Sequence, residues 1–450
     1  MLISKSFIRL ALVLICTSVR LYAQTNVLTY HNDNARTGQN ITETLLTPAS
    51  VSSGQFHKLY SISVDGYVFA QPLVLTNVNL PGQGVHNVVY AATENDSLYA
   101  IDADTGVVLW QLSFINPSAG ITTIPTSAIP DPTPCNDVGT TIGITGTPVI
   151  DPITGTIYLV VSTEENGSFV QRLHAIDVAT QAEKFGGPVV IQATVPGTGN
   201  GSQNGIISFN PLMDNQRPGL LLQNGQVIVG WASHCDFTPY QGWIMAYNSA
   251  TLAQEGVFAT TPNGDKGGVW MGAAGIAADS NFNVFVASGD GDYDGESNWG
   301  DSILELTGPI GGAFAVGDWF TPYNQAYMNT NNKDLGSGGV LLLPDLPAGS
   351  AHQQLLVEEG KLGAIYLIDR NNMGQYCSTC TTTDTQVVQE LTGVVSGLWS
   401  MPAYWNGNVY FGGRADYVKA LSFNANNSGF LSTSPTSQTA KDVYKRQLTD

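Results

Sequence analysis

The chain repeats one phrase along most of its length: an apolar run, a polar turn, and a second run that ends in a small residue followed two positions later by Asp. The clearest copy is VVYAATENDSLYAIDADTGVVLWQ at residues 88–111. The copies weaken along the chain and lie at 88–111, 157–180, 226–251, 283–307, 355–372 and 408–423. Their alignment puts Asp102, Asp177, Asn248, Thr307, Asp369 and Ser422 in one register. Supersecondary units repeated in this way indicate radial or linear repetition.

Each unit is predicted to contain four short strands. The second strands are continuous apolar runs, such as 88–91 and 284–287, which is typical of strands covered on both faces. The first strands are rich in small residues, as in 143–151, which suits a crowded axis. Since one such unit cannot bury both its faces, units must stack around an axis. The prediction is an all-β fold, a β-propeller of four-stranded blades with six blades visible and seven or eight in the complete protein.

The chain is expected to divide into four parts. Residues 1–23 have a positive start, an apolar run at 10–16 and Leu21-Tyr-Ala23 before a cut, the pattern of a signal peptide. An N-terminal extended segment at 24–55 precedes the propeller at 56–430, and 431–450 is an irregular tail that continues no strand pattern. The run FHKLYSISV at 56–64 resembles the outer strand of a further blade. The protein is therefore expected to be exported, to the periplasm or beyond.

Charge and hydropathy limit the partners. The formal net charge is −19, with 36 acidic against 17 basic residues. This argues against nucleic acid and anionic membrane surfaces as partners. Beyond the leader, no segment is long and apolar enough to span a bilayer.

One turn phrase resembles a known family. Ala100, Asp102, Thr105, Gly106 and Trp110 follow the pattern A-x-D-x-x-T-G-x-x-x-W of the pyrroloquinoline-quinone (PQQ)-like propeller repeat. That repeat occurs in quinoprotein dehydrogenases and in the outer-membrane assembly scaffold lipoprotein. The resemblance implies that the Trp packs between blades and that the Asp and Thr-Gly fix the turn. The opening HNDNARTGQN at 31–40 also resembles a group of uncharacterised secreted propellers.

The loop from 290 to 301 has the spacing of a calcium loop. Carboxylates stand at its positions 1, 3 and 5, with Gly at position 6. In calcium loops such alternate acidic side chains converge on the cation, and the Gly permits the sharp turn of the backbone. The candidate ligands are Asp290, Asp292, Asp294, Glu296, Asn298 and Asp301. The alternative is a polar turn between two strands, since Asp301 is shorter than the usual Glu and the flanks read as β.

A quinone site is not favoured. By resemblance, PQQ needs a Trp beneath its ring, an adjacent pair of cysteines above it and Ca²⁺ held by Glu, Asn and Asp. The chain has no adjacent cysteines. Tryptophans 231, 243, 270 and 399 are candidates for the axis, but a blade Trp is more often core. The six histidines are scattered without metal-ligand spacing.

Four cysteines remain after the leader. Cys135 and Cys235 lie in loops of consecutive units, where a bridge would join them. Cys377 and Cys380 would close a small loop. Export permits disulfides, while a zinc site would need further ligands that no nearby His or Cys supplies.

These features predict a non-enzymatic scaffold or binding module that uses one propeller face for a protein or glycan partner. Clusters of Trp and Tyr at 231–243 and 270–323 would suit stacking on sugars, although packing between blades explains them as well. Two alternatives stay open, a PQQ- and Ca²⁺-dependent oxidoreductase and an extracellular carbohydrate-binding or carbohydrate-active protein.

Overall fold

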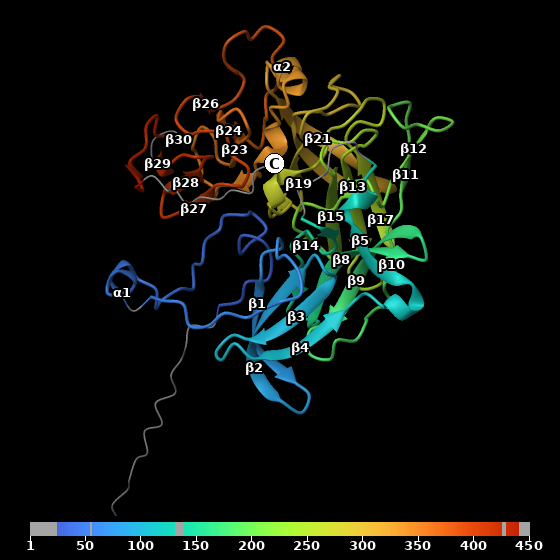
Figure 1. The fold of residues 1–450 in the computed structure, drawn as a ribbon. Coiled ribbons are helices and arrows are strands. Elements are labelled where there is room, and N and C mark those ends of the chain that lie inside the picture. Colours follow the sequence, from blue (N-terminus) through green and yellow to red (C-terminus); the bar gives the residue numbers. More distant parts are fainter. Residues whose placement is uncertain (1–24, 55, 131–138, 425–428, 441–450) are drawn as a thin grey trace, which may run out of the picture.

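A computed structural model describes residues 25–54, 56–130, 139–424 and 429–440. The predicted signal peptide and the last ten residues of the predicted tail lie outside these ranges. Antiparallel sheets follow one another around a centre, from blade 1 (blue) to blade 6 (red), as Figure 1 shows. No helix in the described ranges is long and apolar enough to cross a membrane. The predicted all-β propeller is confirmed.

Blades 1 to 3 form the first half of the ring. Blade 1 holds β1 (Leu73–Leu80), β2 (Gly84–Thr93), β3 (Ser97–Asp102) and β4 (Val108–Ser113). Blade 2 holds β7 (Val149–Asp151), β8 (Thr156–Glu165), β9 (Ser168–Asp177) and β10 (Val189–Val190), extended by β5 (Ile121–Pro125) and β6 (Thr141–Ile142). A hairpin of β11 (Thr194–Pro196) and β12 (Ile206–Ser208) precedes blade 3, which holds β14 (Leu221–Gln223), β15 (Gln226–Ser233), β16 (Trp243–Asn248) and β17 (Gln254–Ala259), with β13 (Asp214–Asn215) beside β15.

Blades 4 to 6 complete the described sheets. Blade 4 holds β18 (Ala277–Ala278), β19 (Val284–Ala287), β20 (Ile303–Ile310) and β21 (Gly312–Thr321), and β21 also pairs in parallel with β17. Blade 5 holds β22 (Leu341–Leu342), β23 (Leu355–Glu359), β24 (Ile365–Asp369) and β26 (Gln389–Leu391), while β25 (Gln375–Tyr376) pairs with β21. Blade 6 holds β27 (Ala403–Trp405), β28 (Asn408–Gly412), β29 (Val418–Asn424), β30 (Phe430–Leu431) and β31 (Ser437–Gln438).

In the part of the chain that the structure describes, helical structure is confined to short connections. These are α1 (Pro48–Ser52), α2 (Gln325–Thr330) and the 3₁₀ turns η1 (Pro117–Ala119), η2 (Thr126–Ala128), η3 (Met271–Ala273) and η4 (Leu335–Ser337).

The residues that the repeat alignment placed in one register all lie on the third strands of their blades. Strands β3, β9, β16 and β24 end at Asp102, Asp177, Asn248 and Asp369. The last three pair with the first residue of the second strand of their blade, whereas Asp102 pairs with Val88 within β2. Asp102 fixes its turn by accepting hydrogen bonds from the backbone amide of Thr105 at 2.7 Å and from its hydroxyl at 2.8 Å. Asp177 does the same with Thr180. A short carboxylate that caps its own turn explains why the phrase recurs at these positions.

The core is shared between neighbouring blades. Trp110 is buried in one cluster with Ile157 and Leu159 of blade 2, so it packs between blades as the resemblance implies. A second cluster joins blades 2 and 3, and a third runs from blade 3 to blade 6. Trp231 and Trp243, two candidates for the axis, are core residues of the second cluster.

The beginning of the described chain crosses the inner strands of all six blades. We call residues 27–37 the hub segment. Its main chain pairs with Val74 of blade 1 at 2.8 Å, and further backbone or amide bonds reach one residue in each other blade: Ile150, Leu222, Ala278, Leu342 and Tyr404. The HNDNARTG motif therefore has a structural role that the sequence did not reveal.

Small residues let the hub segment approach the blades. A Cβ built on Gly275 would lie 2.6 Å from Cζ of Arg36, so this position tolerates no side chain. Gly219 faces Thr147, Tyr30 and Gly275 at the point where blades 2, 3 and 4 meet the segment. The crowded, glycine-lined centre expected from the first strands is present.

Residues 56–64, expected to be the outer strand of a further blade, pair with no described strand. They run against blade 1, where Ile62 and Val64 pack on Ala91, Tyr99 and Ile101. The assignment to a further blade stays a prediction.

Candidate functional site

The predicted calcium loop joins β19 to β20, and Asp294 organises its tip. The Asp294 carboxylate accepts hydrogen bonds from the backbone amides of Glu296, Ser297 and Asn298 at 2.8 to 2.9 Å. Burial opposes ionisation of Asp294, but these bonds together lower its pKa to about 2. Asp294 is thus a capped turn residue with several donors already on its oxygens.

The other predicted ligands point to different partners. Asp292 accepts from the amide of Asp265 at 3.1 Å, and Asp301 accepts from the amide of Leu335 at 3.1 Å. Glu296 is exposed at the tip. Within the described ranges, no three His, Cys, Asp or Glu side chains are arranged to hold a metal. The calcium site stays a prediction.

Asp290 belongs to a cluster of lysines and aspartates built by loops of blades 3, 4 and 5. Lys266 binds Asp290 at 2.6 Å, and Lys361 binds Asp334 at 2.6 Å. Tyr240 donates to Asp236 at 2.9 Å. Burial, followed by repulsion from Asp334 and Asp236, raises the pKa of Asp290 to about 7, although Lys266 opposes the shift. Two of the three aspartates of this cluster are therefore paired with lysines, and Asp236 is bound by Tyr240 instead.

The described residues do not fit the quinone site that the resemblance implies. Two carboxylates of the lysine–aspartate cluster, Asp290 and Asp334, already bind lysines, and Trp399 lies beneath the guanidinium of Arg414 at 5.3 Å. The disulfide joins Cys377 to Cys380, which are not adjacent.

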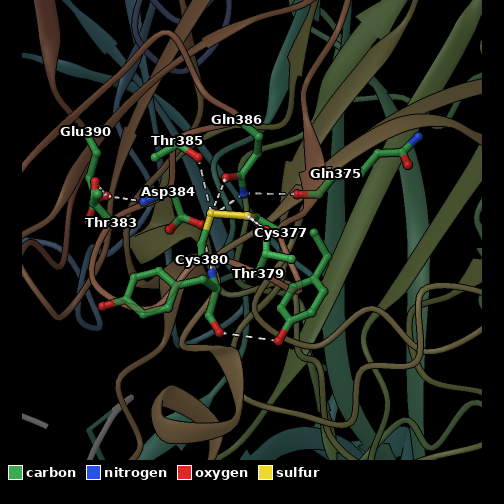
Figure 2. The surroundings of a disulfide bond; sticks show 11 residues. Gln375, Cys377, Thr379, Cys380, Thr383, Asp384, Thr385, Gln386 and Glu390 are labelled. Atoms are coloured by element: carbon green, nitrogen blue, oxygen red, sulfur yellow. Dashed lines mark hydrogen bonds between the residues drawn. A yellow bond between two sulfur atoms is a disulfide. The ribbon is translucent and has the colours of Figure 1, made fainter.

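That disulfide confirms the small loop predicted for Cys377 and Cys380. The two Cα atoms are 5.4 Å apart, and Figure 2 shows Sγ of Cys380 near the hydroxyl of Thr385 at 3.3 Å. The loop lies between β25 and β26, next to Gln386, which donates to Gln375 O at 3.5 Å. Cys235 is also disulfide-bonded, and Cys135, its predicted partner, lies outside the described residues.

A cavity of about 490 Å³ opens between blades 4 and 5, and its lining is almost entirely polar. We call it the polar pocket. It is lined by Asp279, Asn281, Asn283, Glu305, Gly317, Asp318, Gln354, Arg370, Asn371, Asn372 and Gln375. A second cavity of about 530 Å³, between the outer strands of blades 3 and 4, is mainly apolar and includes Trp299 and Trp319, with Glu296 at its edge.

Strand geometry places two carboxylates of the polar pocket side by side. Glu305 of β20 pairs directly with Asp318 of β21. The next pair is Leu306 with Val316, so Gly317 is the extra residue of a bulge. Bulges turn side chains out of the regular alternation and are frequent next to functional sites. A Cβ at Gly317 would lie 3.1 Å from Cγ2 of Thr307 and 3.8 Å from the carboxyl carbon of Glu305, so a larger side chain here would crowd Glu305.

Turns hold the other walls in place. Asp279 accepts hydrogen bonds from the backbone amides of Asn281 at 2.9 Å and Asn283 at 3.0 Å, which fixes the turn between β18 and β19. Asp318 accepts from the amides of Trp319 and Met373, both at 2.8 Å. Asp279 and Asp318 therefore fix the local backbone as well as line the pocket.

Arg370 forms a nearly buried wall of the pocket, with 5% of its side chain exposed. Its Nη2 binds Asp345 at 2.8 Å, and its Nη1 lies 3.8 Å from Asp279. Its Nε is buried and has no hydrogen-bond acceptor among the described residues. A buried donor without an acceptor is unfavourable, and an added ligand oxygen would satisfy it.

Glu305 is the carboxylate of the pocket that the framework leaves free. No hydrogen bond to its side-chain oxygens occurs within the described ranges, and the residue is half-buried. Burial, then the charges of Asp279 and Asp318, raises the pKa of Glu305, while Arg370 opposes the shift. Sequence reasoning missed this pocket because its residues, spread from 279 to 375, have no linear motif beyond Asn- and Asp-rich turns.

Comparisons with known proteins show the fold. No family model matches the chain, and no curated protein matches it. Among solved structures, it is similar to a quinohemoprotein alcohol dehydrogenase from Pseudomonas putida HK5, at 15% identity and a TM-score of 0.53, covering 88% of this chain and 57% of that one. It is also similar to a europium-containing methanol dehydrogenase, at 13% identity and a TM-score of 0.55, covering 88% and 70%.

A third neighbour is the quinohemoprotein alcohol dehydrogenase of Comamonas testosteroni, at 15% identity and a TM-score of 0.53, covering 90% of this chain and 60% of that one. The chain thus spans less than two thirds of the two quinohemoproteins that it matches. At these identities the likeness concerns the fold alone, since one fold carries many functions. The chain has a PQQ-like β-propeller fold.

Proposed function

We propose that this protein is an exported, non-enzymatic propeller that binds a polyhydroxylated ligand, a glycan, in the polar pocket. The observation that carries the proposal is a cavity of about 490 Å³ lined by carboxylates, one arginine and six side-chain amides. Ligand sites usually have volumes of roughly 300–1,000 Å³.

The lining has the chemistry that a sugar needs. A hydroxyl both donates and accepts, so its best partners offer both roles, as amides do, or complementary ones, as a carboxylate and a guanidinium do. The pocket combines Glu305 as a free acceptor with Nε of Arg370 as a free donor. A glycan hydroxyl could donate to Glu305 and accept from Nε of Arg370, and its neighbours could bond to the amides.

The pocket is also preorganised. Glu305 and Asp318 stand on paired strands, and the Asp279 turn is fixed by its own backbone bonds. A rigid site loses little conformational entropy when it binds. Export, which rests on the predicted signal peptide, would bring such a site into contact with extracellular or cell-envelope glycans.

A glycan array followed by calorimetric titration tests the proposal. Gly317→Leu would place a side chain beside Glu305, since a Cβ at 317 lies 3.8 Å from the Glu305 carboxyl carbon. Asn372→Ala removes an exposed lining amide. Both variants are expected to weaken binding about tenfold or more, which corresponds to the loss of one good contact.

Asn79→Ala is the matched control, because Asn79 is an exposed amide on blade 1, far along the ring from the pocket. It is expected to bind like the unchanged protein. A folded protein that binds no glycan on the array, or binding that Gly317→Leu leaves unchanged, would contradict the proposal and favour a protein partner on another surface.

A further inference from the structure

The charges of the polar pocket do not balance. Asp279, Glu305 and Asp318 supply three carboxylates, and Arg370 is the one cation of the lining. Arg370 is moreover held by Asp345, which lies outside the lining, at 2.8 Å. The pocket therefore presents excess negative charge to any ligand.

The excess is concentrated on one residue. Asp279 and Asp318 each accept two backbone amides, which stabilise their charge as a part of the framework. Glu305 has no such donors within the described ranges, and it lies beside Asp318 on the paired strand and within the electrostatic influence of Asp279. An ionised carboxylate in such a place favours a cation beside it.

The nature of that cation follows from the geometry. A divalent metal needs several oxygen ligands converging on one point, and no group of three acidic, His or Cys side chains in the described ranges does so. An ammonium group needs fewer acidic partners, because it donates three hydrogen bonds that amide oxygens can accept as well as carboxylate oxygens. Six amide side chains line the same pocket as Glu305.

We infer that the ligand of the polar pocket is an amino sugar with a free amine, whose ammonium binds Glu305 while its hydroxyls contact Nε of Arg370 and the amides. This inference rests on the proposed function and specifies the ligand class of that site. N-acetylation, which removes the charge and adds bulk, should abolish the preference.

The experiment compares three tetrasaccharides of the same linkage: a glucosamine oligomer, its fully N-acetylated form and the neutral glucose oligomer. Calorimetric titration is carried out slightly below neutral pH, where the amine is charged. The free-amine oligomer is expected to bind about tenfold more tightly than the other two, as one charge-assisted hydrogen bond would provide.

Variants tie the preference to Glu305. Glu305→Gln keeps the shape and removes the charge, so the three oligomers should bind with similar, weaker affinities. Glu296→Gln is the matched control: it removes one carboxylate from the other side of blade 4, at the edge of the apolar cavity, and should keep the preference. Thermal melts of both variants establish that they are folded.

The outcomes separate the two claims. Equal binding of the three oligomers, or a preference that survives Glu305→Gln, overturns the amine inference and leaves the glycan proposal standing. A calcium titration that gives binding sensitive to Glu305→Gln also overturns it, in favour of a metal. Absence of binding to these and all other glycans overturns the proposed function itself.

Discussion

Two buried arginines on this propeller have opposite environments. Arg36, in the hub segment, has every side-chain nitrogen bonded: Nε donates to Ile276 O at 2.8 Å, Nη1 to Thr29 and Tyr30, and Nη2 to Leu220 O at 3.2 Å. Arg370, in the polar pocket, has an Nε with no described acceptor. An arginine whose nitrogens all bind acceptors of the chain has a structural role, whereas an arginine beside a cavity with an unsatisfied donor indicates a site for a bound ligand.

Neighbours reinforce the contrast. Arg36 contacts backbone carbonyls, the Thr29 hydroxyl and Gly275, where even a Cβ would lie 2.6 Å from its guanidinium carbon. Arg370 meets carboxylates, amides and open space. The comparison shows that the chain satisfies every donor nitrogen of the hub arginine, whereas Arg370 keeps one donor without a described acceptor beside an open cavity.

Replacing Arg36 should have the largest effect. Arg36→Ala would leave the oxygens of Ile276, Tyr30 and Leu220 without donors and create a cavity at the centre. We expect a loss of about 3–5 kcal/mol in the free energy of unfolding, as for other fully buried, hydrogen-bonded charges. Urea denaturation followed by far-ultraviolet circular dichroism measures it.

Arg414→Ala is the control for that experiment, because Arg414 is exposed and contacts only the face of Trp399 among aromatic rings. It should cost less than about 1 kcal/mol. If Arg36→Ala lowered the free energy of unfolding as little as Arg414→Ala, the hub segment would not hold the blades together. The structural role assigned to Arg36 would then be wrong.

Glu359 is a buried carboxyl group whose oxygens lack hydrogen-bond donors among the described residues, the acidic counterpart of Arg370. It is fully buried, and neither of its side-chain oxygens has a hydrogen-bond partner in the described ranges. Burial, then repulsion from Asp416, raises its pKa from 4.5 to about 8, against the effect of Lys419. The folded state thus prefers the protonated form, so Glu359 contributes stability below about pH 4.5 that is lost as pH rises through about 8.

Glu359→Gln, which cannot ionise, should remove this pH dependence. Above about pH 8 the variant is expected to be more stable than the unchanged protein by about 1–3 kcal/mol, with the difference shrinking toward acid pH. Urea melts across a pH series measure it. Glu164→Gln, at a half-exposed position of β8, is the control, and a Glu359→Gln curve parallel to that of the unchanged protein would contradict the expectation.

The repeat was predictable because its signals are local. Asp102 and Asp177 cap turns within three residues of themselves, and the strands on either side are continuous apolar runs. Four-stranded blades and their register follow from such short-range patterns.

The hub and the pocket depend on distant contacts, and the sequence did not reveal them. The HNDNARTG motif was visible, but nothing in it says that Asn34 will bond to both Leu222 and Ala278. Likewise Glu305 and Arg370 are 65 residues apart in the sequence, and they come together only because blades 4 and 5 are neighbours. The acidic loop attracted attention because its spacing is linear, yet its carboxylates have separate partners.

Arg370→Gln should affect binding more than folding. The glutamine keeps a donor near Asp345 but loses Nε, the free donor of the pocket. We expect glycan affinity to fall about tenfold and the free energy of unfolding to fall by about 1 kcal/mol. Calorimetry and urea melts on the same preparation measure both. A large loss of stability with unchanged affinity would reverse the roles assigned to the two arginines.

The smallest effect concerns Asp294, an acid that is fully matched on the surface. Its pKa is about 2, below the usual 3.8, because three backbone amides donate to it despite some burial. Its contribution is therefore present above about pH 3.8 and lost as pH falls through about 2. Asp294→Ala should lower the free energy of unfolding at neutral pH by about 1 kcal/mol, with or without added Ca²⁺. Thermal melts in EDTA and in Ca²⁺ distinguish a turn cap from a metal site in this loop. Equal melting midpoints for the unchanged protein would leave Asp294 a turn cap. A Ca²⁺-dependent rise in the midpoint that disappears in an Asp292→Ala, Asp294→Ala double variant would establish the metal site, and would show that bound Ca²⁺ rearranges the present hydrogen bonds.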